Sequence, residues 1–161
     1  MVKLLPILVL IFAASSFAQS SLPSGPKVNG VGLDATYAEV VRKLGKPTRQ
    51  VTDKNLDECT GSHIRTLYYP GLKIELFDAE KNVYKVFSFE ITSAKWDVSG
   101  SKLGDSSAKI QKLFGTRGRS SEKDGAETIW YYETNEDAPG LSNFHFRNGK
   151  LSKVQFGYTM C

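Results

Sequence analysis

The strongest constraint on the fold is an internal repetition of local sequence patterns. Segments 33–45 and 103–115 align without gaps, with the pairs Leu33 and Leu103, Thr36 and Ser106, Val40 and Ile110, Leu44 and Phe114, and Gly45 and Gly115. Three later blocks match in the same order, and the first of these aligns residues 66–69 with residues 128–131. Four matched blocks in one order indicate that a single supersecondary unit occurs twice.

Each copy begins with a pattern that is typical of a short amphipathic helix. Side chains with helical spacing form one stripe, namely Tyr37, Val40, Val41 and Leu44 in the first copy and Ser107, Ile110, Leu113 and Phe114 in the second. Thr36 and Glu39 have the spacing of a capping box, and Gly45 ends the stripe. In the second copy Lys109 stands where the box requires an acid, so the cap at Ser106 is predicted to be weaker.

Strand-like runs bounded by turn residues follow each helix. They are His63–Tyr69, 72–77 and Val83–Ile91, then Glu127–Glu133, 141–147 and 151–159, with short extra strands near 49–52 and 117–121. A short helix is marginal alone, and it covers the apolar face of a small sheet. The predicted class is therefore α+β, with two tandem repeats that each pack a short helix on a three- or four-stranded antiparallel sheet. Whether the two sheets join into one curved sheet stays open.

The N-terminus predicts export. Lys3 precedes an apolar run, and Ser16 and Ala18 place small residues at the positions read by signal peptidase. The predicted organisation is a signal peptide at 1–18, a flexible mature N-terminus at 19–29, a first repeat at 30–98 and a second at 99–161. The expected location is secreted or periplasmic, with no stable membrane anchor because no cysteine lies just after the apolar run. With 21 basic against 17 acidic residues and no basic cluster, no nucleic-acid partner is expected.

The two cysteines, Cys59 and Cys161, are expected to form one disulfide in an oxidising compartment. An intermolecular bridge through the C-terminal Cys161 is the alternative reading of the same pair.

The usual catalytic and metal-binding patterns are missing from the sequence. His63 and His145 are the only histidines, which excludes a three-histidine metal site, and no serine lies in a nucleophile-elbow motif. The acid pairs Asp57-Glu58 and Glu136-Asp137 lie in polar loop segments, where solvated charge is the better explanation. We therefore expect no catalytic residues, metal or cofactor.

Aromatic residues on equivalent strands supply the candidate binding residues. If the side chains that alternate with them face the helices, then Tyr68, Trp130 and Tyr132 point to the uncovered face of the sheet. Tyrosine and tryptophan are favoured interface anchors. Ordinary cross-strand packing explains the same residues equally well.

A short helix that ends in Leu44-Gly45-Lys46-Pro47, followed by a tyrosine-rich strand and a hairpin, resembles the β-lactamase-inhibitor-protein-like (BLIP-like) superfamily. This superfamily includes tandem secreted inhibitors and small outer-membrane-assembly lipoproteins. The resemblance implies one long curved sheet whose concave face binds another protein, in an inhibitor-like manner. The chain differs from those inhibitors in having two cysteines where they carry four, and from the lipoproteins in lacking the lipidated cysteine.

The resulting hypothesis is an exported, non-catalytic module that binds an unidentified protein partner through the helix-free sheet face. The alternatives are a cell-envelope assembly or structural factor, and a small-molecule-binding protein or hydrolase.

Overall fold

The structure is a computed structural model that describes residues 25–116, 119–133 and 140–159. The predicted signal peptide therefore lies outside the described residues. The elements in chain order are α1 (Tyr37–Leu44), β1 (Arg49–Leu56), β2 (His63–Tyr69), β3 (Leu72–Glu80), β4 (Val83–Ile91), α2 (Ser107–Phe114), β5 (Arg119–Asp124), β6 (Glu127–Glu133), β7 (Gly140–Arg147) and β8 (Lys150–Tyr158).

The helix ends are built as their sequences predict. The Thr36 hydroxyl accepts a hydrogen bond from the Glu39 backbone, and the Glu39 carboxylate accepts one from the Thr36 backbone, so the capping box is confirmed. At α2, the Ser106 hydroxyl accepts from the backbone of Lys109, and the first turn has no acidic residue to return the contact. The α2 cap is therefore the simpler of the two, as its sequence predicts.

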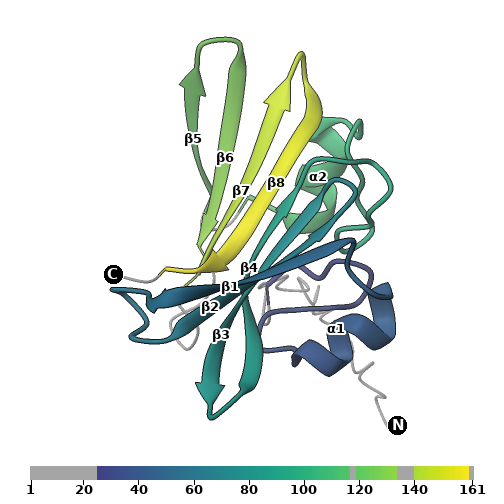
Figure 1. Cartoon of the computed structure of the whole chain (residues 1–161). Coiled ribbons are helices and arrows are strands. Elements are labelled where there is room, and N and C mark those ends of the chain that lie inside the picture. The colour runs from purple at the N-terminus through teal and green to yellow at the C-terminus, as the bar shows by residue number, and fades with distance from the viewer. Residues whose placement is uncertain (1–24, 117–118, 134–139, 160–161) are drawn as a thin grey trace, which may run out of the picture.

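The strands form a single eight-stranded antiparallel sheet with the order β1-β2-β3-β4-β8-β7-β6-β5 (Figure 1). The two four-stranded halves meet where β4 pairs with β8, in the register Ser88 with Gly157, Phe89 with Phe156, Glu90 with Gln155, and Ile91 with Val154. We call this ladder the seam. Because β4 and β8 pair with each other, neither half of the sheet has an unpaired edge strand at the seam.

The predicted fold class is therefore wrong. The molecule is mainly β, one sheet with two short helices, and not two tandem α+β repeats. The predicted boundary between residues 98 and 99 is not tested by this arrangement and stays a prediction.

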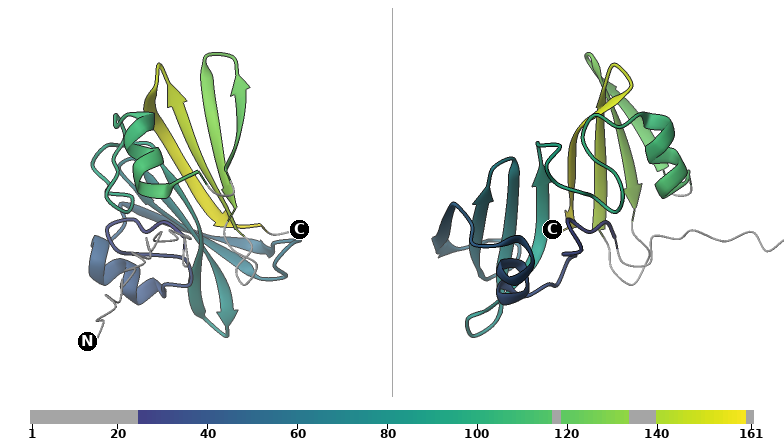
Figure 2. Two further views of the ribbon diagram at one scale, coloured as in Figure 1. Left: turned by 180° about the vertical axis from the view of Figure 1, so that it is seen from behind. Right: turned by 90° about the vertical axis from the view of Figure 1, so that its right-hand side faces the viewer.

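Both helices lie on the same side of the sheet (Figures 1 and 2). The main core fills the space between the helices and the strands. Val40 of α1 and Ile110 of α2 are both fully buried there. The connection between the halves closes the core with Trp96, which is 3% exposed and whose indole N–H donates to the Pro70 carbonyl at 2.9 Å. We call the opposite side of the sheet the helix-free face. Within the described residues, neither helix is long and apolar enough to span a bilayer.

Candidate functional site

The structure separates the three aromatic residues that were predicted to share the helix-free face. Tyr132 is 1% exposed, and its hydroxyl donates to the Gly115 carbonyl at the end of α2, at 3.1 Å. Trp130 lies on the same side as Tyr132, with its ring 4.4 Å from that of Phe146. Only Tyr68 points to the helix-free face. The predicted orientation is therefore wrong for Trp130 and Tyr132.

A one-residue error in the alignment of the two copies explains this result. Tyr69 donates to the carbonyl of Gly45 at the end of α1, at 2.9 Å, which is the contact that Tyr132 makes with Gly115. Tyr132 is thus the counterpart of Tyr69, whereas the sequence alignment paired Tyr69 with Tyr131. A shift of one residue along a strand moves every side chain to the other face.

The residues that correspond on the helix-free face are Tyr68 and Tyr131. The guanidinium of Arg49 lies over the Tyr68 ring, 5.1 Å from its centroid. The Tyr131 hydroxyl donates to the Glu122 carboxylate at 3.1 Å. Each ring is therefore held by a side chain from the neighbouring edge strand, β1 or β5.

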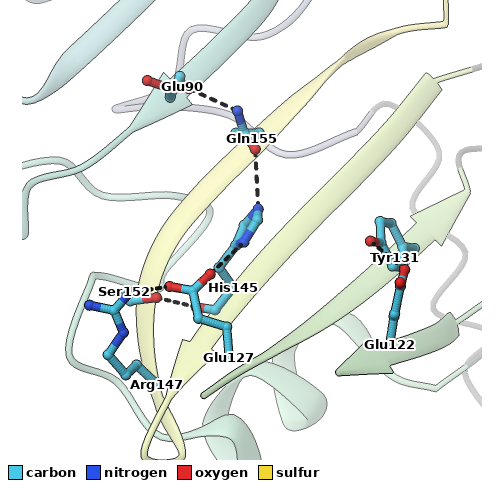
Figure 3. Close-up of polar contacts among 8 residues, drawn as sticks. All are labelled: Glu90, Glu122, Glu127, Tyr131, His145, Arg147, Ser152 and Gln155. Carbon is cyan, nitrogen blue, oxygen red and sulfur yellow. Dashed lines mark hydrogen bonds and ion pairs between the residues drawn. The ribbon is translucent and has the colours of Figure 1, made fainter. Parts of the chain in front are cut away.

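A chain of polar contacts runs across four strands on this face, from β4 through β8 and β7 to β6 (Figure 3). The Gln155 amide donates to Glu90 at 2.8 Å, and its oxygen lies 3.1 Å from Nε2 of His145. Nδ1 of His145 lies 3.4 Å from Glu127, whose other oxygen accepts from Arg147 at 2.7 Å. The chain therefore crosses the seam and joins the two halves of the sheet.

The His145 ring lies nearly buried in the middle of this chain of contacts. The ring is 7% exposed, and both of its nitrogens face side-chain oxygens. Because the Gln155 amide nitrogen donates to Glu90, its oxygen is left to accept from His145. His145 is therefore held between Gln155 and Glu127, with one ring nitrogen facing each of them.

These contacts lower the pKa of Glu127. Desolvation by itself raises the pKa of this carboxyl, but the hydrogen bond from His145 and the charge of Arg147 outweigh it, and the pKa falls below the ordinary 4.5. The unfolded chain therefore binds a proton at a higher pH than the folded chain, so this group stabilises the fold above that range and loses its contribution as the pH falls through it.

We predict that Glu127→Gln flattens the dependence of stability on pH. Between about pH 5 and about pH 3, the free energy of unfolding should fall less in this variant than in the wild type, because the variant lacks the group that titrates. Urea denaturation at several pH values measures the difference. Arg147→Ala, which removes one of the two stabilising contacts, should give an intermediate slope. Identical slopes for all three proteins would contradict the assignment.

A pocket of about 390 Å³ lies on the same face at the seam. Its walls include Lys73, Glu75 and Glu90 on one side and Leu141 and Asn143 on the other. Gly157 also lines the pocket and contributes no side chain to fill it. The pocket and the chain of polar contacts share Glu90 and Gln155, so they form one site.

Two further sequence predictions meet the structure only in part. Cys59 is disulfide-bonded, whereas Cys161 lies outside the described residues, so the pairing of these two cysteines stays a prediction. Of the predicted acid pairs, Asp57-Glu58 includes Asp57, which accepts hydrogen bonds from the backbones of Cys59 and Thr60 and so belongs to a turn. The Glu136-Asp137 pair lies outside the described residues.

No cluster of three metal-ligating side chains occurs in the described segments.

Sequence reasoning missed most of this site. It gave no binding role to His145, Glu90, Glu127 or Gln155. These side chains come from strands that are far apart in the sequence, and they meet only through the register of the seam. Strand alternation alone places each of them on the helix-free face, and this was the available signal.

No family model matches the chain, and no curated protein does. Among the matching solved structures is an extracellular protein containing an SCP domain from Bacillus anthracis, with 14% identity, a TM-score of 0.46, and coverage of 78% of this chain and 44% of the other. Another is a cysteine-rich secretory protein from Staphylococcus aureus, with 17% identity, a TM-score of 0.49, and coverage of 85% and 46%. The chain spans less than half the length of either protein.

The predicted resemblance to the BLIP-like superfamily is not borne out: no family model and no curated protein matches the chain, and neither solved structure named above is described as a member of that superfamily. The motif that suggested it, Leu44-Gly45-Lys46-Pro47, is the end of α1. A glycine after the last helical turn followed by a proline ends helices in many unrelated folds. It therefore carries little information about family.

Proposed function

We propose that the chain is an exported, non-catalytic module that binds a protein partner through the helix-free face. The observation that carries the proposal is that this face holds aromatic and polar side chains in fixed contacts, while both helices pack on the other side. Tyr68 and Tyr131 are each held by one neighbour, Arg49 and Glu122 respectively. Side chains that are ordered before binding lose less entropy when a partner arrives.

The charges along the β5–β6 edge of this face favour a partner with basic side chains. By strand alternation, four carboxylates lie there along β5 and β6, namely Glu122, Asp124, Glu127 and Glu133. Within the described residues, the ion pairs of this group are those of Glu127 with Arg147 and His145. The chain as a whole has a formal charge of +4, so this acidic edge is a local feature. Complementary charge guides association and fixes the orientation of a partner.

The double variant Tyr68→Ala/Tyr131→Ala tests the proposal. Affinity capture from the native secretome with the exported chain identifies a partner, and its dissociation constant is then measured with each variant. We expect the double variant to weaken binding at least about tenfold, because buried aromatic anchors dominate interface energies. Leu113→Ala, which shortens an exposed apolar side chain of α2, should leave the affinity unchanged.

Unchanged binding by the double variant would place the interface elsewhere and refute the proposal. Stable membrane association of the wild-type chain on fractionation would instead favour the cell-envelope factor.

A further inference from the structure

Three glutamates on the helix-free face differ in how their charges are matched. Glu75 accepts from Lys73 at 2.6 Å and from the Ser88 hydroxyl at 2.7 Å. Glu127 has Arg147 at 2.7 Å and His145 at 3.4 Å. Glu90 accepts a hydrogen bond from the neutral amide of Gln155, at 2.8 Å. Within the described parts of the chain, no cation lies within 4.0 Å of Glu90.

This difference matters because Glu90 is partly buried. A carboxylate that leaves water without a cation partner loses solvation that one amide does not replace. Lys73 is the cross-strand neighbour of Glu90, but its ammonium group bonds to Glu75. Of the three glutamates, Glu90 is therefore the one without a direct ion pair within the described residues, and Lys73 acts on it only at longer range.

Asn143, which also lines this pocket, carries an acceptor without a donor. The side-chain oxygen of Asn143 is buried and has no hydrogen-bond partner among the described residues. Buried polar atoms of this kind are rare in native proteins, and each calls for an explanation. With Glu75 already matched, Lys73, Glu75 and Glu90 leave the pocket with one net negative charge.

The shape of the pocket completes the argument. The pocket of about 390 Å³ is open along Gly157, and Leu141 supplies an apolar wall. A group that carries several N–H donors, a positive charge and an alkyl stem matches these walls. Guanidinium and alkylammonium groups have these properties.

We infer that the pocket at the seam binds a guanidinium or alkylammonium group, with Glu90 as its counter-ion. This inference rests on the proposed function in one respect, since it takes the group to be an arginine or lysine side chain of the protein partner. A free amine or guanidine from solution has the same chemistry, and the test separates the two sources.

The first arm of the test compares two small probes of similar shape. Butylguanidine is charged, and butylurea is its neutral counterpart. In NMR titrations of the ¹⁵N-labelled mature chain, butylguanidine should shift the amides of Glu90, Gln155 and Gly157, and butylurea should not. Glu90→Gln keeps the size of the side chain but removes its charge, and it should weaken butylguanidine binding about tenfold. Glu80→Gln, which changes an exposed glutamate at the end of β3 outside the pocket, should bind as the wild type does.

The second arm uses the blocked peptide acetyl-Gly-Arg-Gly-amide and its analogue with citrulline in place of arginine. Binding of the arginine peptide at the same amides, without binding of the citrulline peptide, supports a protein side chain as the natural group. Binding of butylguanidine without the arginine peptide refutes the protein source and assigns the pocket to a free cation.

Equal shifts from butylguanidine and butylurea would overturn the inference. So would unchanged affinity in Glu90→Gln, provided that circular dichroism shows the variant to be folded. These outcomes are distinct from failure of the proposed function, which is read from partner capture with the Tyr68 and Tyr131 substitutions.

Discussion

Replacing Tyr132 with alanine should lower the free energy of unfolding by about 3–5 kcal/mol, the range for deleting a large buried aromatic side chain. The ring lies 5.4 Å from that of Phe144 in an edge-on contact and 6.3 Å from that of Phe114. Its hydroxyl also satisfies the Gly115 carbonyl at the end of α2. The substitution therefore opens a cavity and leaves a helix end without its partner.

Urea denaturation followed by circular dichroism measures this loss. The matched control is Tyr131→Ala, one residue earlier on the same strand but on the opposite face, which should cost less than about 1 kcal/mol. Tyr132→Phe keeps the ring and should cost about 0.5–1.5 kcal/mol for the hydrogen bond alone. A larger loss for Tyr131→Ala than for Tyr132→Ala would reverse the assignment of the two faces.

The second large effect is expected at Gly157, where Gly157→Ala should lower the free energy of unfolding by about 2–3 kcal/mol. A Cβ atom at this position would lie 2.7 Å from the Phe87 carbonyl oxygen and 2.9 Å from Cβ of Ser88. Both contacts are too short, and the first is with backbone, so β4 and β8 must move apart to accept the methyl group. Among the described strands, the seam is the single ladder that joins the two halves, so the whole sheet loses stability.

Gly32→Ala is the control, because its Cβ would meet only the flexible side chain of Lys27, at 3.5 Å or more. Chemical denaturation should find that variant within about 0.5 kcal/mol of the wild type. If Gly157→Ala is equally stable, then the strands at the seam are not as close as the structure places them.

Much of the local structure is predictable from the sequence because its causes are local. The Thr36 and Glu39 pair begins α1 and Gly45 ends it, and both are read directly from residue spacing. His63–Tyr69, Val83–Ile91 and Glu127–Glu133 are strands with the predicted bounds. Alternation and turn residues are sufficient for these elements.

The assembly of the sheet depends on information that the local patterns do not contain. Nothing in the separate patterns of β4 and β8 states that Glu90 will lie beside Gln155, so the sequence predicts two repeats and leaves the joining of their sheets open, whereas one sheet forms. The prediction that Tyr132 points to the helix-free face is wrong for a related reason, since Tyr131 is the residue that does so. Aromatic neighbours in a strand look alike in an alignment, and contacts with Gly45 and Gly115 decide which ones face the helices.

The candidate site was the least predictable part of the molecule for the same reason. His145 and Glu127 lie on adjacent strands, and their carboxylate–imidazole contact required the register of β6 with β7. Glu90 joins them only across the seam. Residues that bind through long-range pairing have no characteristic spacing in the sequence.

The strand order also has a consequence for how the chain reaches its native state. All strand pairs except β4 with β8 join elements that are consecutive in the sequence, so their loops are short to close. The remaining pair brings Ile91 to Val154, across the whole second half of the chain. Closing so long a loop costs more entropy than closing a hairpin. We therefore expect the strand pairs within β1–β4 and within β5–β8 to form early and independently. The pairing of β4 with β8 should be the slow, rate-determining step of folding.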